Sequence, residues 1–313
     1  MKIEDFVSTL IKKAKQGGRY STANAYQSTL NSYQQFTRNP SQTFEEMTPE
    51  EMKQYEQHMI INGLKYNTIS LYIRLLRSIC NQAVTQKIVH LNTAELFQDV
   101  FMGCKPTAKR AIKPSIIGHL IDADFAGHPQ LTFSRDLFLL SFYLRGIPFV
   151  DLAYLRKSDI KDGTLIYFRQ KTGKMMYVTI EDCAQKIINK YAKECRNSIY
   201  LLPILKSVGE EGHKQYRSGL RLYNKHLHQI SKLLKLGTTL TSYVARHSWA
   251  TTAQNTDVPI AVISTSMGHA SEKVTHIYLD SFDSKKLSDA NKKVIACVLK
   301  KKKKEKEVPI LIR

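Results

Sequence analysis

The sequence has 313 residues, of which 42% are hydrophobic and 24% are charged. The length suits two domains of ordinary size, and the composition is that of a soluble globular protein. Lys and Arg outnumber Asp and Glu by 47 to 27, a formal net charge of +20, which favours a nucleic acid as partner over an anionic membrane surface. No apolar run reaches the length of about 18 residues that spans a bilayer, and acidic residues occupy the N-terminus where a secretory signal needs basic ones. We therefore expect a cytoplasmic protein without a membrane partner.

The positive charge is unevenly distributed, because residues 106–313 hold 35 basic and 18 acidic side chains. The cysteines are odd in number, scattered, and without a CxxC pair, so we expect them to be reduced and structural. We expect no metal or other cofactor. The five positions are Cys80, Cys104, Cys183, Cys195 and Cys297.

The first hundred residues predict a small bundle of about four helices with no strand. Two apolar stripes recur at spacings of three and four, as one face of a helix requires. Thr48-Pro49-Glu50-Glu51 is typical of a helix start, with an N-cap followed by Pro and two acids. The stripes are Tyr26, Leu30, Tyr33 and Phe36, then Ile69, Ile73, Leu76 and Cys80.

A boundary is predicted at residues 103–114, where one Gly and two Pro interrupt the periodicity and basic residues cluster. We divide the chain into a helical domain (1–102), a basic linker (103–114), a second domain (115–298) and a basic tail (299–313). Lys109, Arg110 and Lys113 of the linker are candidate DNA contacts, although a solvated hinge would have the same composition. The tail is either a frayed terminus or a segment that docks on a neighbouring subunit.

After the linker the pattern becomes mixed. Residues 133–145 predict a buried helix that Gly146 and Pro148 interrupt, and residues 150–155 begin another. Residues 164–168 and 175–180 predict two antiparallel strands joined by a turn at Lys171-Thr172-Gly173-Lys174. The basic stretch 216–235 returns to a helical pattern. The predicted fold class is mainly α with a small antiparallel β-sheet.

Three stretches hold the candidate chemistry. Arg246-His247-Ser248-Trp249-Ala250-Thr251 comes first, Gly268-His269 follows about twenty residues later, and Tyr278 lies nine residues after His269. Each stretch alone is weak, but their order and spacing resemble the C-terminal signature of the tyrosine recombinases, the phage integrase family. The motifs match over about residues 145–280. Over the whole chain, the resemblance is in the order of the domains.

This resemblance implies a SAM-like helical core-binding domain, a mixed α/β catalytic domain, and site-specific integrase activity on double-stranded DNA. It also implies a homo-tetramer on DNA, a monomer or weak oligomer when free, and a bacterial, nucleoid-associated protein. The stretch 141–151 is similar to integrases of Bacteroidetes mobile elements.

Breaking a phosphodiester without a metal needs a nucleophile, cationic groups for the phosphate oxygens, and a proton for the leaving oxygen. Tyr278 fits the nucleophile, and Arg246, a planar and permanently charged fork, fits the phosphate clamp. His269 would donate to the phosphate or help to remove the phenolic proton, and Lys171 would protonate the leaving oxygen. A 3′-phosphotyrosyl link conserves the bond energy, so no ATP is needed.

Two positions depart from the family pattern. The family has a second catalytic arginine three residues before the position of Asp151, and this chain has Pro148 there. Arg145 lies about one helical turn further back and is the candidate for the second catalytic arginine. Alternatively, Arg145 ends the buried helix by binding its last carbonyls. Where the family has a histidine, three residues before Arg246, the chain has Tyr243, whose phenol can still donate to a phosphate oxygen.

His247 and Asp151 are expected to hold the catalytic side chains in place, and His276 is expected to lie on the helix of the nucleophile. A metal site formed by His247, His269 and His276 is disfavoured because neither cysteines nor clustered carboxylates accompany them. The alternative functions are a catalytically impaired DNA-binding regulator of the same fold, a type IB topoisomerase and a metal-dependent nuclease.

Overall fold

The computed structural model describes residues 1–108, 110–279, 288, 291–293 and 295–296. The chain divides into two compact units: residues 1–108 with 204–219, and residues 109–203 with 220–313. Two predictions concern residues outside the described part: Lys109 as a DNA contact, and residues 299–313 as a basic tail. Within the described part, no helix is long and apolar enough to cross a membrane.

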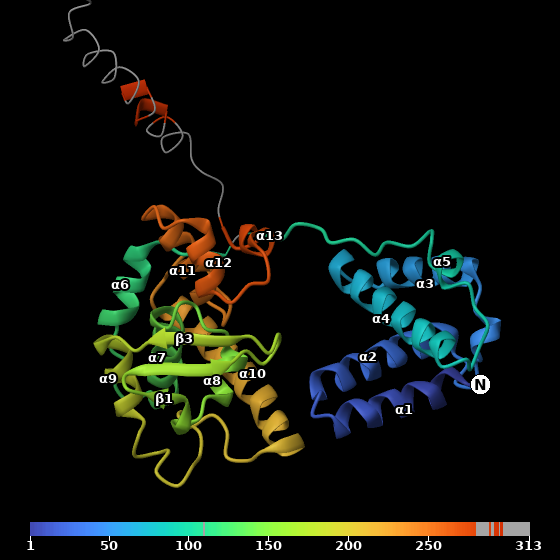
Figure 1. Ribbon diagram of the computed structural model, residues 1–313, viewed down its shortest axis with the longest axis horizontal. Coiled ribbons are helices and arrows are strands. Elements are labelled where there is room, and N and C mark those ends of the chain that lie inside the picture. Colours follow the sequence, from blue (N-terminus) through green and yellow to red (C-terminus); the bar gives the residue numbers. More distant parts are fainter. Residues whose placement is uncertain (109, 280–287, 289–290, 294, 297–313) are drawn as a thin grey trace, which may run out of the picture. The chain divides into compact units, whose positions relative to one another are not determined.

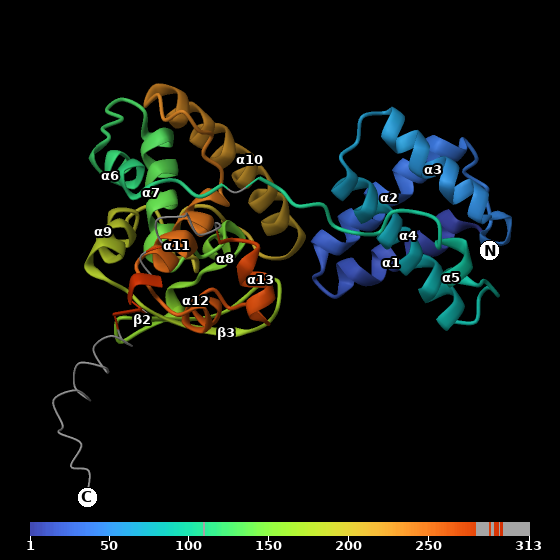
Figure 2. The same ribbon diagram turned by 90° about the horizontal axis from the view of Figure 1, so that it is seen from above.

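The first unit is helical, as predicted. It contains α1 (Ile3–Gln16), α2 (Tyr20–Thr37), α3 (Pro49–Ile61), α4 (Tyr66–Thr85) and the short α5 (Thr93–Leu96), with a 3-10 turn at Phe44–Glu46. Helices α1 and α2 lie side by side, and α4 packs on both α2 and α3 (Figures 1 and 2). The Thr48 hydroxyl accepts from the Glu51 N–H at 3.1 Å, which confirms the predicted helix start.

Both predicted apolar stripes contribute to one core in this unit. Leu30 and Tyr33 of α2 are buried, and Tyr26 and Phe36 pack against the same core from partly buried positions. The α4 stripe is completely enclosed, which fits a central helix of the bundle. Its members are Ile69, Ile73, Leu76 and Cys80.

The second unit combines helices with a small sheet. Helix α6 (Pro114–Asp122) is followed by α7 (Pro129–Tyr143), α8 (Phe149–Tyr154) and a 3-10 turn at Lys157–Asp159. Helix α7 ends where Arg145 and Gly146 both take positive φ values, of 59° and 70°. The helices that follow are α9 (Asp182–Lys190), α10 (Gly209–Leu233), α11 (Val244–Asn255), α12 (Ile260–Ser266) and α13 (Glu272–His276); residues 209–219 of α10 are grouped with the first unit.

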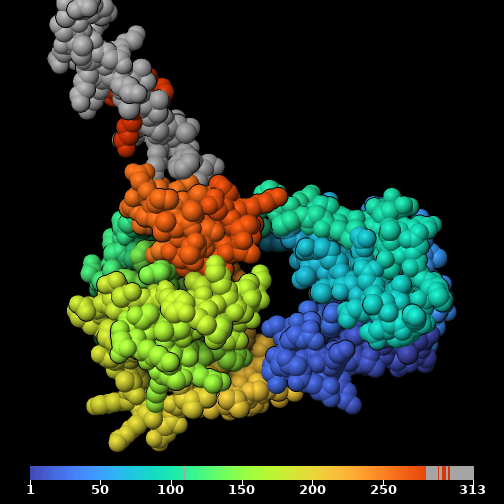
Figure 3. Space-filling model, viewed as in Figure 1, coloured from blue at the N-terminus to red at the C-terminus, as the bar shows by residue number. Residues whose placement is uncertain are grey.

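The sheet is antiparallel with strand order β1 (Ile160–Lys161), β2 (Thr164–Phe168), β3 (Met175–Thr179). In the β2–β3 register, Leu165 faces Val178 and Tyr167 faces Met176, and all four side chains are buried. This alternation fits a sheet with one face on the core. Helix α7 packs against α6, α9 and α11, and α12 packs against α11 and α13. In Figure 3 the orange atoms of the α11–α13 region adjoin the yellow-green atoms of the strands.

Candidate active site

Tyr278 lies two residues beyond α13, with its side chain half-buried. Its ring stacks on that of His269, with 5.0 Å between centroids and an interplanar angle of 27°, and lies 4.7 Å from the ring of His247. The guanidinium carbon of Arg246 is 5.3 Å from the centroid of the same ring. The structure therefore brings together three predicted catalytic side chains, from α11, the α12–α13 connection and the segment after α13, with His247 beside them.

Arg246 is almost completely buried on α11, with 3% of its surface exposed. Nη1 donates to the carbonyl of Gly146 at 2.7 Å, and Nη2 donates to the carbonyl of Met267 at 2.7 Å and to Nε2 of His269 at 2.9 Å. Burial, and then the charge of Arg169, lowers the pKa of Arg246, whereas the phenol of Tyr278 acts in the opposite direction. Three hydrogen bonds thus fix the guanidinium beside the candidate nucleophile.

Gly146 makes room for Arg246. A Cβ at this position would lie 2.9 Å from the Cα of Arg246, and the φ of +70° belongs to the left-handed region that favours glycine. Gly146 directly follows Arg145, so the backbone of the predicted second arginine runs close to Arg246. Arg145 is half-buried, and its Nη1 donates to the carbonyl of Tyr177 on β3 at 3.3 Å.

His269 bridges the arginine and the nucleophile segment. Besides accepting from Arg246, its ring has Nδ1 2.8 Å from the hydroxyl oxygen of Thr275. Burial lowers the pKa of His269 to about 4, and the positive charges of Arg246, Arg169, Lys174 and Lys171 act in the same direction. The imidazole is therefore neutral at physiological pH.

A buried ion pair lies behind these groups. Nε of Arg169 is 2.7 Å from Oδ2 of Asp151, and the Gln170 N–H donates to Oδ1 of Asp151 at 2.9 Å. Burial is the largest effect on Asp151 and raises its pKa, although the Gln170 N–H and the Arg169 charge oppose this. Nη1 of Arg169 donates to the Met267 carbonyl, which also accepts from Arg246. Asp151 therefore contacts Arg169, which shares the Met267 carbonyl with Arg246.

Arg169 was not among the residues predicted from the sequence. Its signal was present in the strand alternation, because Leu165 and Tyr167 face the core and the next position of that period is Arg169. A charged residue at an inward position requires a buried partner. Gly268 supports the arrangement: its φ is +66°, and a Cβ there would lie 3.0 Å from Nη1 of Arg169.

Lys171 and Lys174 lie in the predicted turn between β2 and β3. The turn is closed by the Arg169 N–H donating to the Lys174 carbonyl at 2.9 Å and by the Gly173 N–H donating to the Arg169 carbonyl at 2.8 Å. Both lysines are exposed, and Nζ of Lys174 donates to the His269 carbonyl at 3.4 Å. The turn thus places the Lys174 ammonium beside the His269 backbone, and the charge of Lys171 also acts on the His269 ring.

The remaining predicted residues lie at the periphery. The Tyr243 side chain is 53% exposed at the residue preceding α11. Arg110 and Lys113 are exposed on the linker, and the Ile112 N–H donates to Oγ of Ser248 at 3.0 Å, which anchors the end of the linker on α11. His276 is exposed at the last position of α13.

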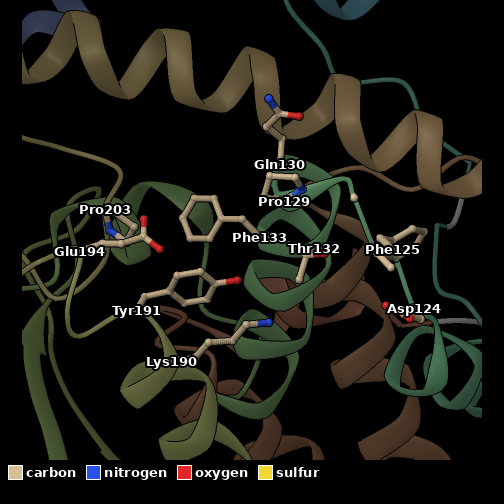
Figure 4. Close-up of a pocket in the computed structure, with 12 residues that line it drawn as sticks. Asp124, Phe125, Pro129, Gln130, Thr132, Phe133, Lys190, Tyr191, Glu194 and Pro203 are labelled. Carbon is tan, nitrogen blue, oxygen red and sulfur yellow. The ribbon is translucent and has the colours of Figure 1, made fainter.

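A separate hollow of about 540 Å³ lies between the start of α7 and the end of α9 (Figure 4). Phe133 and Tyr191, whose centroids are 4.8 Å apart, line it with Lys190 and Glu194. None of the predicted site residues lines this hollow. Within the described residues, no three His, Cys, Asp or Glu side chains are grouped so that they could hold a metal ion.

The fold and the Tyr278–Arg246–His269 cluster can be compared with known proteins. Residues 2–100 match the phage integrase SAM-like domain, and residues 130–285 match the phage integrase family. A tyrosine recombinase XerC from Thermodesulfovibrio yellowstonii is 23% identical over 275 residues, which are 85% of this chain and 87% of that protein.

Solved structures show the same fold. A lambda integrase fragment, crystallised as a dimer on a core site, has a TM-score of 0.66 at 17% identity and covers 91% of this chain and 99% of its own. The Tn1549 transposon integrase in complex with a circular intermediate DNA has a TM-score of 0.63 at 14% identity, with 94% and 99% covered.

The fold and the site define a DNA strand-breaking and rejoining enzyme that uses a tyrosine. The chain belongs to the phage integrase family, the family of the tyrosine recombinases.

Proposed function

We propose that this protein is a site-specific recombinase that cuts and rejoins double-stranded DNA through a 3′-phosphotyrosyl link at Tyr278. The observation that carries the proposal is the stacking of the Tyr278 ring on His269, 5.3 Å from the buried guanidinium of Arg246.

In the first step the Tyr278 oxygen attacks phosphorus, the bond from phosphorus to O5′ breaks, and the phenolic proton passes to a base. The O5′ takes a proton from Lys171, and Arg246 and Arg145 hold the non-bridging oxygens as negative charge builds up. Resealing reverses these transfers onto the 5′ hydroxyl of another strand. Because one phosphodiester is exchanged for another through the tyrosyl ester, no ATP is needed, and the cationic side chains take the place of a metal ion at the phosphate.

His269 is the base in this proposal. It is neutral at physiological pH, and its ring stacks on the ring that must lose a proton. His247 packs on Tyr278 at 4.7 Å and helps to orient the phenol. Tyr243, exposed at the residue before α11, would donate a hydrogen bond to a phosphate oxygen.

Most contacts with the DNA phosphates would come from basic residues outside the Tyr278–Arg246–His269 cluster. On α10, the apolar residues Tyr223, Leu227 and Ile230 are buried, while Arg221, Lys225 and Lys232 are exposed at spacings of four and seven. Such an arrangement leaves a line of positive charge along the helix. The exposed linker residues Arg110 and Lys113, with Lys109, would add phosphate contacts.

For strand exchange between two DNA sites, we propose four copies on DNA, with the free protein monomeric or weakly associated. The solved lambda integrase complexes include a tetramer bound to a Holliday junction. We further propose that the protein acts in the cytoplasm, at the nucleoid. The division into a core-binding domain (1–102), a linker (103–114) and a catalytic domain (115–298) is part of the same proposal.

The test is to incubate the protein, in EDTA, with nicked duplexes made from the junctions that flank its gene. The nick lets the cleaved fragment diffuse away, so a covalent adduct accumulates. We expect an adduct of protein and DNA from the wild type and none from Tyr278→Phe, with Tyr177→Phe as the control for an exposed tyrosine elsewhere. DNA binding without any adduct would instead identify a regulator, relaxation of any supercoiled plasmid a topoisomerase, and cleavage only without EDTA a metal-dependent nuclease.

A further inference from the structure

Thr275 connects two parts of the candidate site. Its side chain is fully buried at α13, three residues before Tyr278. Its hydroxyl oxygen lies 2.8 Å from Nδ1 of His269, and its carbonyl accepts the N–H of Tyr278 at 2.9 Å. One residue thus contacts the imidazole by its side chain and the nucleophile by its backbone.

The donors around His269 determine where its proton lies. A guanidinium has only N–H donors, so Nε2 of His269, at 2.9 Å from Nη2 of Arg246, must be the acceptor. A neutral imidazole with an unprotonated Nε2 carries its proton on Nδ1, and the atom in reach of that proton is the Thr275 oxygen. Thr275 is therefore the acceptor of the Nδ1–H of His269.

We propose that Thr275 is a positioning residue that holds His269 in the Nδ1–H form, so that Nε2 faces the site as the acceptor for the phenolic proton of Tyr278. The inference rests on the proposed function and decides between the two roles that the sequence leaves open for His269. A histidine that donated from Nε2 to the phosphate would need the opposite tautomer or a second proton.

The proton balance follows from this arrangement. When a phosphate oxygen takes over the Nη2–H of Arg246, Nε2 becomes available, and the proton of the attacking phenol moves to it. The resulting imidazolium keeps its Nδ1–H bond to Thr275, so the ring does not have to reorient. On resealing, the proton returns from Nε2 to the departing phenolate.

Burial and the charges that face His269 keep the ring neutral before cleavage, and they also make it a weaker base, so proton transfer needs the negative charge that develops on the phosphate. Arg246, Arg169, Lys174 and Lys171 all disfavour a protonated imidazole, and burial lowers its pKa to about 4. The ring is therefore a neutral acceptor before cleavage. The imidazolium formed during attack arises as negative charge develops on the phosphate, which offsets the repulsion.

The first test needs no DNA. Nitrogen NMR of protein with ¹⁵N-labelled histidine, at neutral pH, reports which ring nitrogen of His269 is protonated, and the signal is identified by its loss in His269→Asn. We expect Nδ1 to be protonated in the wild type and in Thr275→Ser, and a mixture of tautomers in Thr275→Val. A proton on Nε2, or on both nitrogens, in the wild type would overturn the proposal whether or not the variants fold.

The second test measures the rate of adduct formation on the nicked duplex. General acid–base catalysis supplies about 10²–10⁴-fold, and we expect Thr275→Val to lose about tenfold or more while DNA affinity is unchanged and Thr275→Ser is close to the wild type. Thr256→Val is the matched control, because the Thr256 hydroxyl donates only to carbonyls at the end of α11, those of Thr252 and Ala253, among the bonds of the described chain. Equal rates for Thr275→Val and the wild type would contradict the positioning role.

The two proposals fail separately. If the wild type forms no adduct on any flanking junction, the proposed function is wrong, and the NMR measurement still decides whether Thr275 holds the tautomer. If the adduct forms but His269 is protonated on Nε2, the recombinase function stands and the role of Thr275 is wrong.

Discussion

The Nη2 of Arg246 donates to Nε2 of His269 across 2.9 Å, which joins a buried cation to a neutral ring. The bond holds both side chains in place before DNA arrives, and its acceptor is the atom that we expect to receive the phenolic proton. Preorganised donors of this kind are a large part of catalysis because they need little rearrangement during the reaction.

The pH dependence of stability should report on His269. Its folded-state pKa of about 4 lies below the ordinary value of 6.5, so its contribution to stability is fully present above pH 6.5 and is lost as the pH falls towards 4. We expect the free energy of unfolding to decrease over this range more steeply in the wild type than in His269→Asn, as measured by urea unfolding at a series of pH values. Parallel curves for the two proteins would contradict the pKa shift.

Gly146→Ala should disturb the site more than an alanine at another left-handed glycine. Gly163 has a φ of +72°, and no atom lies within 4 Å of the place that a Cβ would take there, so Gly163→Ala carries the same backbone strain without a clash. The Cβ at position 146 would press on Arg246, and overpacking costs about 1–3 kcal/mol. We expect urea unfolding to show Gly146→Ala less stable than Gly163→Ala by about this amount, with a slower adduct rate. Equal stability of the two variants would mean that residue 146 can move away from α11.

Lys171 should be required only when the leaving group needs a proton. Lys171→Ala should slow cleavage of an ordinary nicked duplex by about 10²–10⁴-fold and recover on a duplex with sulfur in place of the bridging O5′, because a thiolate leaves without protonation. Lys174→Ala is the matched control from the same turn; its Nζ donates to the His269 carbonyl. If Lys174→Ala is instead the variant that is slow on the ordinary duplex and recovers on the sulfur-substituted duplex, Lys174 is the acid and Lys171 is not.

Basic residues on α10 should determine the salt dependence of binding. With about six to ten neutralised phosphates, affinity should fall about a thousand-fold or more between 50 and 200 mM salt. Replacing both Arg221 and Lys225 by Gln should reduce the slope of log affinity against log salt by about 1–2, as measured by fluorescence anisotropy. Lys186→Gln, on an exposed position of α9, is the control, and a slope unchanged in the double variant would remove α10 from the DNA-binding surface.

The sequence alone determined the local features of this protein. The spacings of three and four residues in the first hundred positions, and the alternation from 164 to 179, fixed the helices and the sheet because each depends on neighbours along the chain. The ordered motifs from Arg246 to Tyr278 identified the family, since these residues lie within about thirty positions of one another.

The tertiary structure decided the contacts between distant segments. The pairing of Asp151 with Arg169, and the meeting of Gly146 with Arg246 across one hundred positions, depend on how α7, α8, the sheet and α11 pack, which no local period records. The grouping of residues 204–219 with the first unit is of the same kind. The hydroxyl of Thr275 became significant only when folding brought it to Nδ1 of His269, because hydrogen bonding is decided by distances in space and not along the chain.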